Sequence, residues 1–190
     1  MRDTNSNPHQ PSDEELVKRF LKGDKTALDE LLQRYYSRVY RLAYGILRNP
    51  QDAEDALQET FIRVFKGIDR LKSVESFDVW LMRIAINVAR SLVRKREPPY
   101  VPIENIEELV DGYADQPFHA MDRRALKTAL EKAISELPVE LKEPFILRDI
   151  EGMKVKEIAH VLGISESLVK VRAHRARLLL RKKLVEYMME

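Results

Sequence analysis

Cysteine is absent from this sequence of 190 residues, and no long apolar run is present. Without cysteine the chain can form no disulfide, no thiolate zinc site and no cysteine nucleophile, which suits a reducing compartment. No apolar stretch approaches the ~18 residues of a membrane-spanning helix, and the polar start MRDTNSNPHQP lacks the apolar core of a signal peptide. We therefore expect a cytoplasmic protein with no membrane insertion.

Glycine is also scarce, with 6 in 190 residues, and alternating strand patterns are nearly missing. Apolar residues instead recur with the 3.6-residue period of helices. Helix starts are marked by chemistry: Ser12 and Glu15 have the spacing of a capping box, and Asn49 precedes a first-turn proline, Pro50. These signals predict an all-α protein of one or two domains with a core large enough to fold unaided.

Lysine and arginine are absent from one internal segment, residues 97–120, which also holds four of the nine prolines. Helical periodicity stands on both sides of it. We interpret the segment as a flexible linker between two small helical domains. The predicted domains are residues 12–96 and residues 121–187, the second a helix-turn-helix domain.

The second domain carries the helix-turn-helix pattern. EGMKVKEIAHVLGIS combines an apolar helix, a turn at Gly163 and a helix cap at Ser165, and the second helix of such a motif enters the DNA major groove. The stretch SLVKVRAHRARLLLRKK then holds seven Lys or Arg residues and no acid. At ~100° per residue, one side of this segment aligns Lys170, His174, Arg177 and Arg181. A separate stripe, expected to be buried, consists of Val169, Ala173, Ala176, Leu180 and Leu184. A solvated basic helix is the alternative, but it would not require the turn and the cap.

In the first domain, the segment 49–68 predicts an amphipathic helix. Opposite its apolar side lie Asp55, Glu59 and Ile62, flanked by Asp52 and Gln58. An apolar residue surrounded by acids is typical of a protein-docking face, although an acidic solvated face is the alternative. The residues expected to face inward are Ala53, Ala56, Leu57, Thr60, Phe61, Val64 and Phe65.

A second basic stripe is predicted on the segment 77–96, on a different flank from its apolar side. Trp80 borders both regions, so it either stacks on an unpaired base or belongs to the core. The stripe consists of Arg83, Asn87, Arg90 and Arg94.

Motifs for catalysis are missing. We find no P-loop, glycine fingerprint, zinc motif or catalytic dyad, and the four histidines are dispersed without carboxylate companions at ligand spacing. We expect neither an enzyme nor a bound metal or cofactor.

Three motifs occur in one order: DAEDALQETFIRVF, then FDVWLMRIAIN, then LPVELKEPFILRDIEG followed by the helix-turn-helix. With them the chain resembles bacterial RNA polymerase sigma factors of the sigma-70 family, extracytoplasmic-function (ECF) group, over about residues 13–184. The resemblance implies a factor that brings core polymerase to promoters and opens them. It also implies four partners: the clamp helices of the largest polymerase subunit, the polymerase flap, promoter DNA and a cognate anti-sigma factor.

The resemblance assigns roles to residues. For core polymerase binding it implies Asp52, Asp55, Gln58, Glu59 and Ile62. For the minus-10 element it implies Leu71, Lys72, Ser73, Ser76, Trp80, Arg83, Asn87, Arg90 and Arg94. For reading the minus-35 element it implies Lys170, Val171, His174 and Arg175, with phosphate contacts from Arg148, Arg172 and Arg177.

Two positions depart from the family pattern. Leu71 stands where the family often has Phe in the pocket for an everted base, and Lys154 replaces a frequent capping Ser or Thr. These changes bear on the promoter sequence. The alternative function is a helix-turn-helix transcription regulator with an amino-terminal dimerisation or sensing bundle. Such a bundle would not need the acidic face around Ile62 together with the Arg83 stripe.

Overall fold

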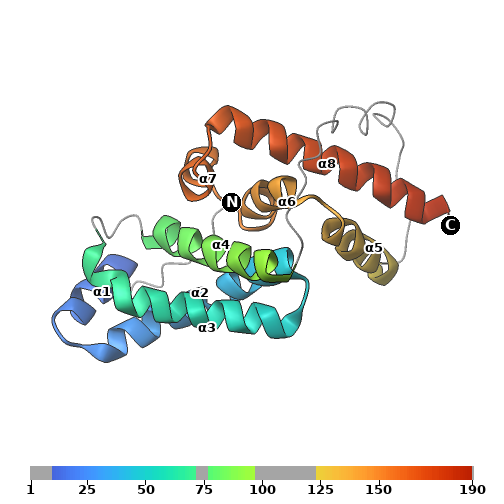
Figure 1. Ribbon diagram of the computed structural model, residues 1–190. Helices are drawn as coiled ribbons and strands as arrows, with labels where there is room; N and C mark the ends of the chain where they lie inside the picture. The colour runs from blue at the N-terminus through green and yellow to red at the C-terminus, as the bar shows by residue number, and fades with distance from the viewer. Residues whose placement is uncertain (1–9, 72–76, 97–122, 190) are drawn as a thin grey trace. The chain divides into compact units, whose positions relative to one another are not determined.

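The computed structural model describes residues 10–71, 77–96 and 123–189, and it divides the chain into two compact units, Met1–Lys95 and Arg96–Glu190. All regular structure in the described residues is helical (Figure 1), so the all-α prediction is confirmed. The finer boundaries at 12–96, 97–120 and 121–187 stay a prediction, since most of the expected linker lies outside the described residues.

Unit 1 is built around α2, which packs against α1 and α3. Val88 of α4 joins Ala43, Ala53 and Ala56 in a buried cluster, and small residues there let α4 approach α2 and α3 closely. The elements of unit 1 are α1 (Asp13–Leu21), α2 (Lys25–Leu47), α3 (Pro50–Gly67), the 3₁₀ turn η1 (Ile68–Arg70) and α4 (Phe77–Arg96).

Unit 2 is built around the long carboxy-terminal helix α8, which packs against α5, α6 and α7. Its elements are α5 (Arg123–Ser135), α6 (Val139–Phe145), the π turn η3 (Ile146–Ile150), α7 (Val155–Leu162) and α8 (Glu166–Met189). The predicted buried stripe of α8 is confirmed, because all five members are buried: Val169, Ala173, Ala176, Leu180 and Leu184.

Helix starts follow the predicted caps. The Ser12 hydroxyl accepts the Glu15 N–H at 3.1 Å, and the Asn49 side chain accepts the Asp52 N–H at 3.1 Å. Each bond satisfies one of the amide donors that a helix leaves unpaired at its start. These local bonds fix where α1 and α3 begin.

One predicted core residue is wrong. Phe65 is 58% exposed. It follows the buried Thr60 by five residues, and at ~100° per residue this turns it ~140° away from the core. Its ring instead meets the edge of Phe20 on α1, with centroids 6.1 Å apart.

Candidate protein-docking and nucleic-acid interfaces

The predicted docking face lies on α3. Asp55 and Gln58 are exposed, and Ile62 is 47% exposed although it is a branched apolar residue. Glu59 is half-buried, and its carboxylate binds the Arg63 guanidinium at 2.7 Å. An exposed apolar side chain among acids fits a protein-binding surface.

Asp52 does not belong to this face. Its exposed fraction is 5%, so its prediction as a flanking docking residue is wrong. Asp52 lies four residues before the buried Ala56, on the same side of the helix, and the two positions share the inward direction. The docking face therefore begins at Asp55.

Phe65 extends the docking face instead. It lies three residues after Ile62, so the two exposed side chains are neighbours on α3. Leu21, beside the Phe20 ring that Phe65 contacts, is also exposed. The i, i+3 spacing of Ile62 and Phe65 in the sequence indicated that the two side chains are neighbours. The helical periodicity of the segment nevertheless led us to assign Phe65 to the core.

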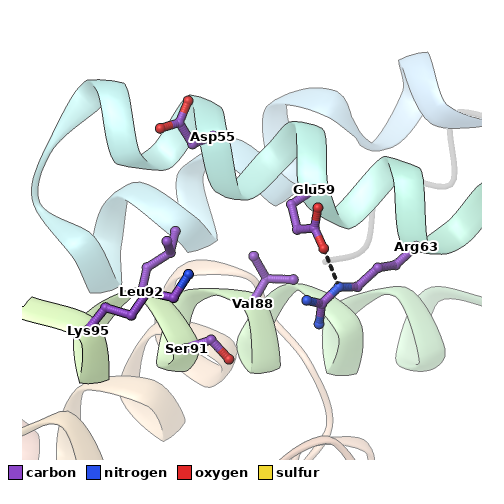
Figure 2. A pocket seen from close by; sticks show the side chains of 7 residues that line it. All are labelled: Asp55, Glu59, Arg63, Val88, Ser91, Leu92 and Lys95. Carbon is purple, nitrogen blue, oxygen red and sulfur yellow. Dashed lines mark hydrogen bonds and ion pairs between the residues drawn. The ribbon is translucent and has the colours of Figure 1, made fainter.

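A groove of about 400 Å³ runs between α3 and α4 (Figure 2). Val88 and Leu92 give it apolar walls, and Glu59 and Arg63 form their ion pair at its edge. Its remaining lining residues are Asp55, Ser91 and Lys95. The acids of the docking face thus adjoin α4, the helix of the basic stripe.

The basic stripe of α4 is largely open to solvent. Arg83, Asn87 and Arg94 are exposed, and Arg90 is half-buried. Arg94 donates to the Ser91 hydroxyl at 3.4 Å. Positive side chains on one helix side can neutralise neighbouring phosphates of a nucleic-acid strand.

Trp80 is half-buried at the start of α4. Its ring centroid lies 6.0 Å from that of Phe77, and a Cβ atom at Gly67 would lie 3.4 Å from its Cζ2. The indole therefore packs against α3 on one side. Leu71 is half-buried as well, while Lys72, Ser73 and Ser76 lie outside the described residues.

The first turn of α4 is anchored to α2 by charge and aromatic contact. The Arg38 guanidinium pairs with the Asp78 carboxylate, and the Tyr35 ring meets the edge of Phe77 with centroids 5.4 Å apart. The Tyr35 hydroxyl donates to Asp13 at 2.6 Å. Burial, reinforced by that carboxylate, raises the pKa of Tyr35 above its ordinary value, so the phenol stays a donor. These contacts hold the helix that carries Trp80.

Unit 2 forms the predicted helix-turn-helix. Gly163 ends α7 in the left-handed region, with φ of 69°, and the Ser165 hydroxyl accepts the Leu168 N–H at 3.2 Å to start α8. Lys154 cannot cap α7 through its ammonium, which has no acceptor. The Glu157 carboxylate instead accepts the Lys154 N–H at 2.8 Å, one half of a capping box.

The predicted minus-35 readers lie on the solvent side of α8. Lys170, Val171 and His174 are exposed, and Val171 retains 42% of its surface. Arg148, Arg172, Arg175 and Arg177 are half-buried. The Arg177 Nε–H donates to Asp149 at 3.3 Å, a contact that the sequence did not predict.

No cluster of three or more His, Cys, Asp or Glu side chains suited to a metal ion occurs within the described ranges. Over the same residues, no helix is both long and apolar enough to span a membrane.

Comparisons with known proteins agree with this two-unit layout. Residues 31–98 match the model of sigma-70 region 2, and residues 127–180 match that of sigma-70 region 4. RNA polymerase sigma-H factor of Pseudomonas aeruginosa is 32% identical over 88% of this chain and 91% of its own. ECF RNA polymerase sigma factor SigW of Bacillus subtilis is 33% identical over 88% of this chain and 94% of its own.

Solved structures give the same picture. CnrH in complex with the cytosolic domain of CnrY matches with a TM-score of 0.66 and 25% identity, over 88% of this chain and 94% of that one. Sigma factor RpoE in complex with the anti-sigma factor NepR from Bartonella quintana shares the fold, with a TM-score of 0.61, 22% identity and coverage of 83% and 96%.

The fold and the two family matches define a protein of the sigma-70 class. Within that class, the chain belongs to the ECF group of RNA polymerase sigma factors. It therefore acts in transcription initiation, and the alternative of a helix-turn-helix regulator with a sensing bundle is not favoured. Sigma factors are DNA-binding regulators rather than enzymes.

Proposed function

We propose that this chain docks on core RNA polymerase through α3 and directs the holoenzyme to promoters with α4 and α8. The observation that carries the proposal is the solvent-facing pair Ile62 and Phe65 on the helix that also presents Asp55 and Glu59. A few apolar anchors supply most of the affinity of an interface, while complementary charge steers the encounter. The acids suit a basic partner surface on the clamp helices of the largest subunit.

Unit 2 is proposed to read the minus-35 element, with the polymerase flap as its protein contact. The exposed Lys170, Val171 and His174 can reach base edges in the major groove, and Val171 suits a thymine methyl group. Arg175 is proposed as a further base reader. The proposed phosphate contacts are Arg148, Arg172 and Arg177, which would fix the position of α8 on the duplex.

Unit 1 is proposed to recognise and open the minus-10 element. Opening a duplex requires capture of an unstacked base, which offsets an unstacking cost of a few kcal/mol. The exposed side of α4 carries positive charge for the strand's phosphates, and in the sequence Leu71 precedes and Trp80 follows the segment 72–76. The proposed contacts are Leu71, Lys72, Ser73, Ser76, Trp80, Arg83, Asn87, Arg90 and Arg94.

A protein inhibitor is part of the proposal. The RpoE structure contains an anti-sigma factor, and CnrH was solved with a cytosolic domain of CnrY. We propose that a cognate anti-sigma factor covers the docking and DNA surfaces of this chain, that the chain performs no catalysis itself, and that it acts with polymerase in the cytoplasm.

Run-off transcription from a promoter library tests the proposal, with core polymerase in the presence and absence of the chain. We expect specific transcripts only when the chain is present. Asp55→Lys combined with Glu59→Lys should abolish core binding in a pull-down and leave the fold intact, because neither side chain is fully buried. The Glu59–Arg63 pair is solvated and contributes little to stability.

A matched control is Asp29→Lys, which reverses an exposed acid on α2 instead of α3. Core capture by the folded double variant at the parent level would show that the docking face is wrong. Failure of the parent chain to direct any transcript would refute the function itself.

A further inference from the structure

Asp149 places a negative charge on the helix-turn-helix unit, directly beside a proposed DNA contact. Its two carboxylate oxygens both lie 3.3 Å from the Nε atom of Arg177. DNA is a polyanion, so an acid at this surface lowers affinity unless it performs another task. The contact joins residues 28 positions apart, which makes it a feature of the folded unit.

The backbone holds Asp149 in place. It lies in η3, where the Glu151 N–H donates to the Ile146 carbonyl at 2.9 Å across a π turn. A π turn inserts one residue into a helix and so redirects the side chains that follow it; such turns are frequent at functional sites. Gly152 follows in the left-handed region, with φ of 67°, and the Met153 N–H donates to the Leu147 carbonyl at 2.9 Å. The carboxylate is therefore presented to α8 from a fixed position.

Arg177 lies on the side of α8 that faces solvent with Lys170 and His174, three residues after His174. A guanidinium has five N–H donors, of which four belong to the two terminal nitrogens. Asp149 engages the Nε–H, so the terminal nitrogens remain available for a phosphate. The pair can thus orient Arg177 without occupying the fork that binds oxyanions.

Stability alone explains the pair poorly. The two side chains retain 40% and 30% of their exposure. Ion pairs that are this solvated contribute little to folding, because water screens the attraction and the side chains lose conformational freedom.

We propose that Asp149 is a positioning residue for DNA binding, holding the Arg177 guanidinium so that its terminal nitrogens meet a backbone phosphate beside the minus-35 element. The inference rests on the proposed function. According to this inference, Asp149 raises the affinity for DNA, whereas its negative charge alone would lower it.

The direction in which the DNA affinity changes when Asp149 is substituted therefore tests the proposal. Holoenzyme is assembled from core polymerase and full-length chain, and its affinity is measured by filter binding over a salt series. The two duplexes carry either a minus-35 sequence selected by the parent or a scrambled one. We expect Asp149→Asn to weaken binding to both duplexes about fivefold, because a neutral amide holds the Arg177 guanidinium less strongly than a carboxylate does. In an Arg177→Ala background, the same change should cause no further loss.

Glu186→Gln serves as the control, since it removes an equal charge from an exposed position on α8. It should leave the affinity unchanged or raise it slightly. Arg177→Lys offers a second variant, because it keeps the charge but loses the Nε–H contact and the planar fork. It should lose affinity and keep the parent's salt dependence.

The inference is overturned if holoenzyme with the Asp149→Asn chain binds the duplexes as tightly as the parent does, or more tightly. An equal loss in the Arg177→Ala background would also overturn it, since the effect would then not pass through Arg177. If Asp149→Asn does not fold, parent-like affinity of Arg177→Lys would do the same. If the parent holoenzyme fails to distinguish the two duplexes, the proposed function itself is wrong, and the inference falls with it.

Discussion

Arg175 and Arg177 lie two residues apart on α8 but should contribute differently to DNA binding. If Arg175 forms a bidentate base contact, Arg175→Ala should weaken minus-35 binding by about 1 to 3 kcal/mol and relax the base preference. Arg177→Ala should weaken binding to all sequences alike and lower the salt slope by about one unit. Filter binding of holoenzyme to selected and scrambled duplexes measures both. Equal losses on the two duplexes for Arg175→Ala would show that it does not read bases.

A single substitution of Phe65 tests whether this residue belongs to the docking face or to the core. Truncation of a buried Phe costs about 3 to 5 kcal/mol of stability, but Phe65 is 58% exposed and contacts Phe20 only at a ring edge. We expect Phe65→Ala to lower affinity for core polymerase about tenfold or more, as interface anchors do, with little change in thermal stability. Phe77→Ala is the matched control, because its fully buried ring should cost stability instead. A melting temperature that falls equally in both variants would place Phe65 in the core.

At the scale of helices, the sequence predicted the features that depend on interactions between residues close in the chain. The caps at Ser12, Asn49 and Ser165 and the buried stripe of α8 depend on residues within a few positions of one another. Positions at the border of a helix face were predicted less well. Asp52 is buried and Phe65 is exposed. The packing of neighbouring helices decides how much of the surface of α3 is buried, and the helical periodicity of the sequence does not contain this information.

Contacts between distant elements were beyond prediction. The Arg177–Asp149 pair depends on a π turn, which the spacing of residues in the sequence does not predict. The Arg38–Asp78 pair depends on how α2 and α4 pack. Such pairs need the tertiary structure, since the residues have no common period or motif. The charged helix faces could be predicted, but the side chains that orient them could not.

The ends of α5 and α8 are joined by a polar contact that should respond to pH. Glu136 accepts bonds from Lys183 and from the Tyr187 hydroxyl, the latter at 2.7 Å. The Lys183 bond, followed by that of Tyr187, holds the pKa of Glu136 below its ordinary value of 4.5. A depressed carboxyl pKa stabilises the folded state above the unfolded-state pKa, and this stabilisation is lost as the pH falls through the folded-state pKa.

Glu136→Gln should therefore lower the melting temperature at pH 7, and the gap to the parent should close on acidification below about pH 4.5. The effect should be small, because the pair is solvated. Thermal unfolding of both chains across this pH range measures it, with Glu186→Gln as an exposed control. A gap that stays constant with pH would mean that Glu136 contributes by packing rather than by charge.

Across the whole molecule, the charges almost cancel, with 33 Lys and Arg against 31 Asp and Glu. Binding to DNA therefore depends on where the charges lie. Screening limits the reach of exposed charges to ~8 Å at physiological salt, so each charged helix side acts as a local surface. A near-neutral chain can in this way present one face to a basic protein partner and others to DNA.

Promoter opening and minus-35 recognition should be separable, because they are assigned to different units. In the sequence, the segment 72–76 lies between η1 and α4, directly after Leu71. Exchange of Lys72 to Ser76 for the corresponding segment of another ECF sigma factor should change which minus-10 sequences open. Minus-35 preference should stay the same, since α8 is untouched. The physical reason is that an everted base is selected by the pocket that receives it, whereas α8 reads stacked base edges in an intact duplex.

Permanganate footprinting of a promoter library with core polymerase reports which templates melt. The control is an exchange of Lys22 to Lys25, in and beside the turn between α1 and α2, which should leave both preferences as they are. A chimera that supports transcription with the parent's minus-10 preference would refute the assignment of the 72–76 segment. Recognition of the minus-10 element would then rest on α4 alone, with Trp80 and the Arg83 stripe as the residues to vary next.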